Sequence, residues 1–305
     1  MFSLALRRLA TAVPTLLVVI TVAFFMMRAA PGGPFDEERA LPEQIRRNID
    51  AYYHLDRHLL VQYFEYLLNV LRGDLGPSFK VRDFTVNELL ASGLPVSLRL
   101  GGSAILLALV IGASLGALAA LRQNRLADHA VMAVAMTGIT LPNFVVAPLL
   151  TLLFGVYLHW LPVAGWQSAT SAVLPIVALA LPQIAYIARL TRGSMIEVLG
   201  ANYIRTARAK GLGERITVLR HALKPALLPV VSYLGPAAAG LMTGSVVIES
   251  IFDIPGVGRH FVKGALNRDY TLVMGTVILF GGFIILFNLL VDLAYGWLDP
   301  KVRQS

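Results

Sequence analysis

Six long runs of residues without a charged side chain constrain the fold of this chain more than any other feature. Each run is apolar and close to or above the length of about 20 residues that a helix needs to cross a bilayer. Because the bilayer core offers no water to backbone amides, a single apolar run can satisfy them only as a helix. The sequence therefore predicts an all-α integral membrane protein with six transmembrane helices. The runs cover residues 9–27, 100–121, 130–158, 172–188, 226–248 and 270–291.

The composition supports this class. Charged residues make up only 14% of the chain and its mean hydropathy is +0.68, both far from the values of a soluble domain. The absence of cysteine excludes disulfides and thiolate metal sites. The first run could be a secretory signal, but it is longer than a usual signal core, and Arg28 interrupts the small residues before Pro31 where cleavage would fall. We therefore expect an uncleaved first span.

Prolines and glycines give two of the runs a specific shape. The run 130–158 contains Pro142 and Pro148, so we expect it to be bent or tilted. The run 100–121 contains Gly112 and Gly116, whose spacing favours close contact with a neighbouring helix.

Residues 31–98 form the one long polar segment, in which acids and bases are mixed. Residues 56–73 are predicted to form an amphipathic helix with Asp56 as its N-cap and Gly73 as its C-cap. A shorter helix is expected at 42–53. We interpret the segment as a small helical cap packed on the mouth of the membrane domain. The apolar stripe expected on the longer helix consists of Leu59, Leu60, Tyr63, Phe64, Leu67, Leu68 and Leu71.

The net charge of +8 is unevenly distributed. With six spans, both termini lie on one side, and that side carries 14 of the 26 Lys and Arg residues but only four of the 18 acids. The opposite side carries 12 bases and 13 acids, and the remaining acid, Asp292, directly follows the sixth run and is assigned to the sixth span. The positive-inside rule therefore predicts cytoplasmic termini. The basic charge is explained by topology, so no nucleic-acid partner is expected.

The stretch 191–229 is the longest polar interruption in the apolar second half. It predicts two short helices, one from about Asn202 to Lys210 that stops at Gly211, and one from Glu214 to about Leu223 before Pro225. Ile204, Ala207 and Gly211 on the first helix, and Ile216, Leu219 and Leu223 on the second, recur at helical spacing and give each helix a face for docking.

The composition of this basic hairpin allows two interpretations. It could be a loop that only obeys the positive-inside rule. It could also be a DNA-binding helix-turn-helix, although the flanking spans argue against this.

Catalytic motifs are absent from the sequence. The chain contains no G-x-x-x-x-G-K-[ST] phosphate loop, no H-E-x-x-H and no G-x-S-x-G, and its six histidines are scattered. We therefore expect no catalytic residue, no metal site and no cofactor in this chain.

Two acids fall near or within the apolar runs, and intramembrane carboxylates merit a functional hypothesis. Glu249 lies at the outer end of the fifth run and Asp292 near the cytoplasmic end of the sixth. Each could instead reach an interface or pair with a neighbouring helix, and we favour that interpretation.

The sequence RTARAKG, followed after nine residues by HALK, resembles the EAA loop of ABC importer permeases. Ala207 and Gly211 match that motif, whereas Arg205, Thr206 and Lys224 stand where it has Glu, Ala and Pro. In that family a helix of this loop fits a cleft in the ATPase subunit. The resemblance implies that Arg205, Thr206, Ala207, Arg208, Lys210 and Gly211 couple the chain to an ATPase.

The resemblance extends over essentially the whole chain. The opening LRRLATAVPTLLVVITVAFFMMRAAPGGPF, then YHLDRHLLVQYFEYL, LRGDLGPSFK, LPVSLRLG, MTGITLPNFVVAPLL and GSVVIESIFDIPGVGRHFVKGALNRDY are similar to dipeptide and oligopeptide permeases. The chain most resembles the B-type permease subunit of bacterial oligopeptide importers. The ordered series of motifs is more specific than any single one.

This resemblance implies a type I ABC importer transmembrane fold in the bacterial inner membrane. It also implies four kinds of partner: a homologous C-type permease, two ATPase subunits that bind ATP and Mg, a periplasmic or lipid-anchored peptide-binding protein, and the peptide itself. The path would lie between the two permeases, and ATP binding would open its outer side.

The expected division of the chain is 1–30 for the N-terminus and first span, 31–98 for the periplasmic segment, 99–298 for the permease domain with a coupling loop at about 192–225, and 299–305 for the cytoplasmic tail. A dipeptide-selective permease is the alternative within the same family. An ion-driven secondary transporter would need mid-membrane ionisable groups and repeated spans, and only Asp292 fits. A membrane scaffold or receptor without transport activity is a third alternative.

Overall fold

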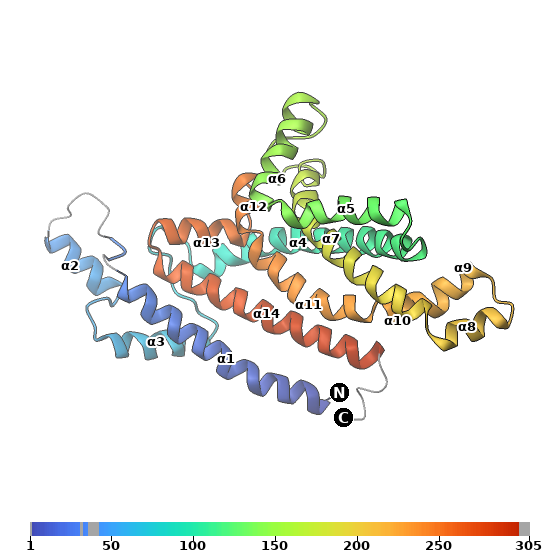
Figure 1. Ribbon diagram of the computed structural model, residues 1–305. Helices are drawn as coiled ribbons and strands as arrows, with labels where there is room; N and C mark the ends of the chain where they lie inside the picture. Colours follow the sequence, from blue (N-terminus) through green and yellow to red (C-terminus); the bar gives the residue numbers. More distant parts are fainter. Residues whose placement is uncertain (1, 31–32, 36–42, 299–305) are drawn as a thin grey trace.

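The computed structural model describes residues 2–30, 33–35 and 43–298, and the regular structure in these ranges is helical (Figure 1). Five helical segments are long and apolar enough to cross a membrane, and a sixth is counted if one bent pair forms a single span, all within the described residues. The prediction of about six spanning helices is therefore confirmed. The five are α1 (Phe2–Ala29), α4 (Val86–Leu121), α7 (Val173–Leu199), α11 (Leu228–Gly244) with α12 (Val246–Ile251), and α14 (Tyr270–Leu298).

The bent pair corresponds to the proline-containing run. Helix α5 (Leu126–Thr140) is followed by α6 (Asn143–Leu150) and the π-helix η1 (Thr151–Tyr157), with a bend of 105° between them. The bend falls at Leu141, whose φ of −90° and ψ of 120° are extended because the following Pro142 disfavours the helical conformation. In Figure 1, α6 leaves the direction of α5 and rises beside α12. The predicted bend is confirmed.

Helix α7 lies at the centre of the molecule and packs closely against α4 and α5. A Cβ atom on Gly112 or Gly116 of α4 would come within 2.9 Å or 2.4 Å of a backbone oxygen of α7, and Gly138 makes the same approach from α5 at 2.8 Å. Such distances require glycine. The predicted role of Gly112 and Gly116 in helix contact is confirmed.

Several spans are longer than their uncharged runs, α4 and α7 most of all. Helix α4 begins at Val86, where Thr85 and Glu88 form a capping box, 14 residues before residue 100. The predicted domain boundary at residue 98 therefore falls inside this helix. Helix α7 similarly continues past residue 188 to Leu199. A charge limits what the bilayer core accepts, but it does not end a helix.

The polar segment contains α2 (Glu43–Tyr52) and α3 (Leu59–Leu71). The prediction that Asp56 caps α3 is wrong, because His58 is the N-cap and accepts from the amide of Leu60. The side-chain amide of Gln62 donates to the carbonyls of Leu55 and Arg57 at 3.1 Å and 2.7 Å, which favours a turn before the helix. At the other end Arg72 is the cap and Gly73 follows with φ +78°, the position that favours glycine.

The buried side of α3 differs in part from the predicted stripe. Tyr63 and Leu67 pack, together with Tyr66 and Val70, against Phe24 of α1 and its neighbours. The remaining predicted stripe residues, Leu59, Leu60, Phe64, Leu68 and Leu71, are exposed. The segment thus packs on the last turns of α1 and the first turns of α14.

Glu249 is fully buried and bound by neighbouring helices. Its carboxylate accepts hydrogen bonds from the hydroxyls of Ser97 and Ser245 at 2.7 Å each, and from the amide of Arg259 in the first turn of α13 (Val257–Leu266) at 3.2 Å. The preference for a helix-pairing role is therefore confirmed for Glu249. The side chain of Asp292 lies outside the described residues.

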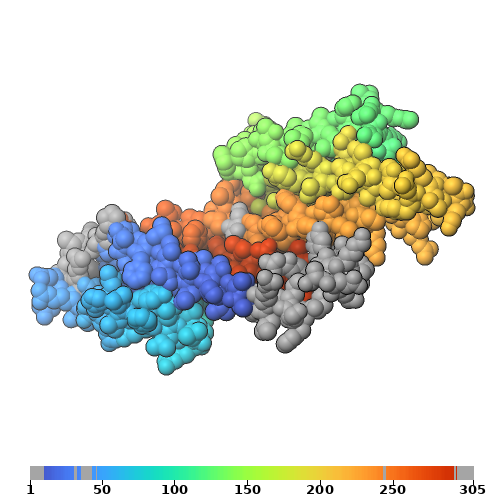
Figure 2. All heavy atoms as spheres, turned by 60° about the horizontal axis from the view of Figure 1, so that its bottom comes forward, coloured from blue at the N-terminus to red at the C-terminus, as the bar shows by residue number. Residues whose placement is uncertain are grey.

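The described helices form a molecule with two distinct ends. The start of α1, the end of α14 and the basic segment after α7 lie toward the right in Figure 1, whereas α2, α3 and α13 lie toward the left. In Figure 2 the blue residues of α1–α3 and the yellow residues after α7 likewise occupy opposite ends of an elongated molecule. We call these the hairpin end and the α13 end.

Candidate coupling site

The basic segment after α7 folds as a helical hairpin, residues 202–226. Its first arm is α8 (Asn202–Ala209), as predicted to within one residue. Its second arm begins at Glu214, as predicted, but consists of α9 (Glu214–Ile216), the π-helix η2 (Thr217–Ala222) and α10 (Leu223–Ala226). The expected stop before Pro225 does not occur. A π-helical stretch precedes the proline, and a wider turn can accommodate a residue that has no amide donor.

Two glycines form the turn of the hairpin. Gly211 has φ +81°, a left-handed conformation that side-chain-bearing residues rarely adopt, and its amide donates to the carbonyl of Arg208 at 2.9 Å. Gly213 is the N-cap of α9, and a Cβ on either glycine would meet open space. The turn is thus sharp and uncovered.

The inner face of the hairpin packs within this chain. Ile204 is 0% exposed and Ala207 is 8% exposed. Ile204 packs against Met195 of α7 and against Val218 and Ala222 of the second arm, and Ala207 is buried on the same helix. The face that the sequence assigned to docking therefore attaches the hairpin to its own support. Ala207 is not available to a partner in this conformation.

An ion pair joins the two arms across the turn. Arg208 donates from Nε and Nη2 to the carboxylate of Glu214 at 3.0 Å and 2.6 Å. These hydrogen bonds hold the pKa of Glu214 below its ordinary value and raise the pKa of Arg208. The pair bridges the two arms and occupies Arg208, one of the cations that the sequence assigned to coupling.

The outer face of the hairpin is exposed and basic. Five of the six predicted coupling residues lie on it, and in the part of the chain that the structure describes neither Arg205 nor Lys210 makes an ion pair. Four large apolar side chains are also exposed there, and two of them, Tyr203 and Leu212, were not singled out from the sequence. The outer face comprises Tyr203, Arg205, Thr206, Arg208, Lys210, Gly211, Leu212, Ile216 and Leu219.

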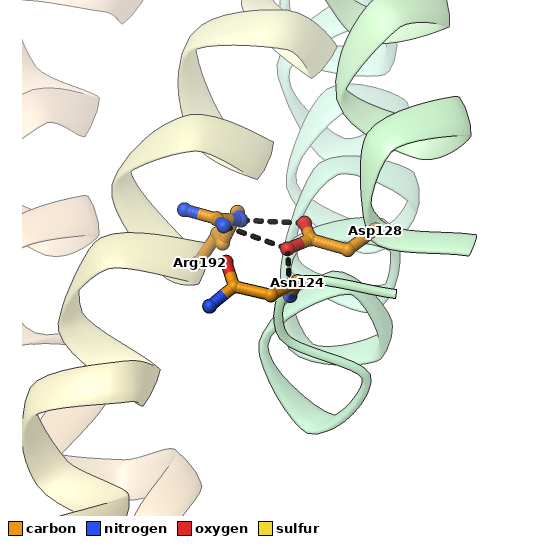
Figure 3. Close-up of polar contacts among 3 residues, drawn as sticks. All are labelled: Asn124, Asp128 and Arg192. Atoms are coloured by element: carbon orange, nitrogen blue, oxygen red, sulfur yellow. Dashed lines mark hydrogen bonds and ion pairs between the residues drawn. The ribbon is translucent and has the colours of Figure 1, made fainter. Parts of the chain in front are cut away.

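A second ion pair anchors the helix that carries the hairpin (Figure 3). Arg192 of α7 donates from Nε and Nη2 to the carboxylate of Asp128 at 2.6 Å and 2.7 Å. The same carboxylate accepts from the amide of Asn124, which has φ +60° in the turn between α4 and α5. The Asp128 side chain is 1% exposed. This clamp ties three helices together less than two turns before α7 ends.

Sequence reasoning missed the clamp. Asp128 and Arg192 were counted only as topogenic charges, and they are 64 residues apart. Their only sequence signal is a charge at the end of each of two apolar runs. The arrangement as a whole can transmit a displacement from the hairpin to α7, α4 and α5. Within the described residues no group of three His, Asp or Glu side chains could hold a metal ion.

Comparison with known sequences gives a consistent result. Residues 112–304 match the family model described as "Binding-protein-dependent transport system inner membrane component". The chain is 56% identical over 305 residues to the oligopeptide transport system permease protein OppB of Escherichia coli K12, covering 99% of this chain and 100% of that protein. It is 48% identical over 289 residues to the dipeptide transport system permease protein DppB of Bacillus subtilis, covering 95% and 94%.

Two solved structures share the fold. Inward-facing MetNI, a methionine ABC transporter, has a chain that aligns with a TM-score of 0.56 and 19% identity, covering 69% of this chain and 96% of that one. An amino acid ABC transporter with histidines aligns with a TM-score of 0.54 and 17% identity, covering 68% and 93%. At these identities the likeness concerns the fold alone.

Proposed function

Because the chain belongs to the family of binding-protein-dependent transport system inner membrane components, we propose that it is the membrane-spanning permease of an ATP-driven importer of oligopeptides in the bacterial inner membrane. The observation that carries this proposal is the 56% identity to an oligopeptide permease over 99% of the chain. The 48% identity to a dipeptide permease supports a second candidate, a dipeptide-selective permease.

The proposed assembly requires partners. A homologous permease completes the path, two ATPase subunits bind ATP and Mg, and a peptide-binding protein delivers the substrate. This chain holds no cofactor in the proposal. We place the hairpin end in the cytoplasm because it carries the excess of basic residues.

The hairpin supplies the coupling in this proposal. Its inner face and the Asp128–Arg192 clamp attach it to α7, so that the hairpin and the cytoplasmic part of α7 move as one body. Its outer face offers apolar side chains such as Leu219 within a basic surround, which suits an acidic cleft with an apolar floor. Ala207 contributes by holding the hairpin, whereas Arg205, Lys210 and Gly211 contribute as contact surface.

The test is to co-express the chain with the neighbouring reading frames and to isolate the complex. We expect ATPase subunits to co-purify with the unchanged chain. Replacing Leu219→Glu on the outer face should remove them and abolish ATP-dependent peptide uptake. The matched control is Leu266→Glu, which alters an exposed leucine of α13 at the opposite end and should retain both.

Two outcomes would contradict the proposal. One is a chain that purifies alone and moves substrate on an ion gradient, which would identify a secondary transporter. The other is full uptake by the Leu219→Glu variant, which would show that the outer face of the hairpin does not couple the chain to an ATPase.

A further inference from the structure

A cavity of about 430 Å³ lies at the α13 end, remote from the hairpin. It opens between the last turn of α1, the helices α2 and α3, and the loop that leads into α4. The volume is within the range of about 300–1,000 Å³ that is usual for small-molecule sites. The lining side chains that matter are Arg28, Tyr52, Tyr53, Gln62, Tyr66 and Phe79.

Two contacts hold the guanidinium of Arg28 in place. Its Nε donates to Oε1 of Gln62 at 3.1 Å, and its Cζ lies 3.6 Å from the ring centroid of Phe24. Gln62 is itself fixed by its two bonds to backbone carbonyls. Among the described residues no carboxylate pairs with Arg28, because Glu65, the acid that lines this cavity, is bound by Arg57. The fork of Arg28 therefore keeps donors for a ligand.

The hydroxyl of Tyr66 provides a second, independent sign of a missing ligand. It is buried and has no hydrogen-bond partner among the residues that the structure describes. Buried polar groups are almost always satisfied, so an unpaired hydroxyl indicates an absent partner such as a water or a ligand. Tyr66 and Arg28 line the large cavity together, and both also border a smaller void of about 10 Å³ beside Phe24.

The remaining walls are aromatic. The rings of Tyr53 and Phe79 lie 4.7 Å apart between centroids, and those of Tyr52 and Tyr53 lie 5.0 Å apart in an edge-on arrangement. Such walls bind flat or apolar groups, whereas the guanidinium and hydroxyl bind an anion. A single unpaired guanidinium matches a monoanion, and its planar fork matches a carboxylate.

We propose that this cavity is a binding site for the carboxylate of an amphipathic organic acid, such as the C-terminal residue of a short apolar peptide. The carboxylate accepts hydrogen bonds from Arg28 and Tyr66, and the apolar body lies against Tyr53 and Phe79. This site goes beyond the proposed function, because it lies apart from the hairpin and a ligand can occupy it without ATP.

The experiment uses the assembled transporter in nanodiscs, without its binding protein and without ATP. Calorimetry measures the binding of the peptide Ala-Ala-Phe, its C-terminal amide, N-acetylphenylalanine and inorganic phosphate. We expect saturable binding of both acids and at least about tenfold weaker binding of the amide, because one charge-assisted hydrogen bond is lost. Retained binding of N-acetylphenylalanine would show that the carboxylate and one aromatic group suffice.

Variants locate the ligand. Arg28→Gln should weaken binding of the acids at least about tenfold, and Tyr66→Phe, which removes only the unpaired hydroxyl and preserves packing, about threefold to tenfold. Lys263→Gln removes one exposed charge at the same end and should leave binding unchanged. Tyr66→Phe keeps the test decisive if Arg28→Gln fails to fold.

Three results would overturn the inference: equal binding of the acid and the amide, no saturable binding of either acid, or binding of phosphate alone. Because peptide uptake is not part of this measurement, its failure would leave the transport proposal standing.

Discussion

The buried carboxylates of the α13 end and the carboxylates of the hairpin end are bound by different kinds of donor, although exposed ion pairs such as Arg259–Asp253 also occur at the α13 end. At the α13 end two buried carboxylates bind uncharged donors: Glu249 binds two serine hydroxyls and the amide of Arg259. Asp269 binds Ser78 and the amides of Phe79 and Leu272. At the hairpin end the corresponding ties are bidentate arginine–carboxylate pairs, and one of them is largely exposed.

This difference separates two mechanical roles. Carboxylates at helix N-termini satisfy amides that have no partner within the helix, and burial protects these bonds from salt and water. Exposed ion pairs are screened and contribute little net stability, so they can be exchanged for contacts with another protein. The α13 end is therefore a fixed base, and the hairpin end is a surface that a partner can engage.

The largest expected effect comes from disrupting the fixed end. A Cβ on Gly256 would lie 2.3 Å from Oε2 of Glu249 and 2.6 Å from the hydroxyl of Ser97. Gly256→Ala should therefore displace a buried carboxylate from its donors and destabilise the protein by about 3–5 kcal/mol. Thermal unfolding in detergent measures the loss.

Gly102→Ala is the control for that change. Gly102 lies in α4, and a Cβ atom at this position would meet open space. The substitution should leave the unfolding temperature unchanged or raise it slightly, since alanine favours a helix. Equal effects of the two substitutions would show that the Glu249 network does not secure the α13 end.

The next effect concerns the clamp beneath the hairpin. Asp128→Asn removes the charge that holds Arg192 and the turn at Asn124, so α7 loses this polar tie to the turn between α4 and α5 and keeps only its packing. We expect amide hydrogen exchange in residues 202–226 to accelerate about tenfold, while α13 keeps its protection. Exchange followed by mass spectrometry gives both values. Unchanged exchange would mean that the packing of the hairpin protects its amides without the clamp.

The local signals in the sequence predicted much of the fold. Charge-free runs located the spans because bilayer compatibility depends on each segment's own composition. The hairpin arms began at Asn202 and Glu214 as expected, because the glycines that separate them act on their immediate neighbours. Pro142 predicted the bend in the third run for the same reason.

The polar connections could not be predicted in this way. Ser97 and Glu249 are 152 residues apart, and nothing near either residue specifies the other. The N-cap of α3 was misassigned because Gln62, four residues into the helix, fixes the preceding carbonyls. Helical spacing identified the apolar face of Ile204 and Ala207, but it could not tell whether that face meets this chain or a partner.

A smaller effect on stability, with a large effect on function, is expected at the hairpin turn. Gly211→Trp places a bulky side chain on the outer face and forces a left-handed conformation that costs about 1–2 kcal/mol. Peptide uptake should fall at least about tenfold if the turn lies in a closely fitted interface.

Gly211→Asn separates the effect of backbone strain from the effect of side-chain bulk, because asparagine tolerates the left-handed conformation and is small. It should retain most of the uptake. If both variants transport normally, the turn lies outside the interface, and the hairpin end is not the surface that a partner engages.

The smallest expected effect is at the exposed pair of Arg208 and Glu214. Arg208→Gln should cost only about 0.2–1 kcal/mol, and less at high salt, because both side chains are solvated. The pKa of Glu214 is lower in the folded protein than its ordinary value, so its contribution is complete at neutral pH and is lost as the pH falls through that lowered value. Unfolding measured between neutral and acidic pH should thus show the variant and the parent converging at low pH. Divergence of the two at low pH, or a neutral-pH loss as large as that of Gly256→Ala, would contradict the distinction between a fixed end and an adaptable one.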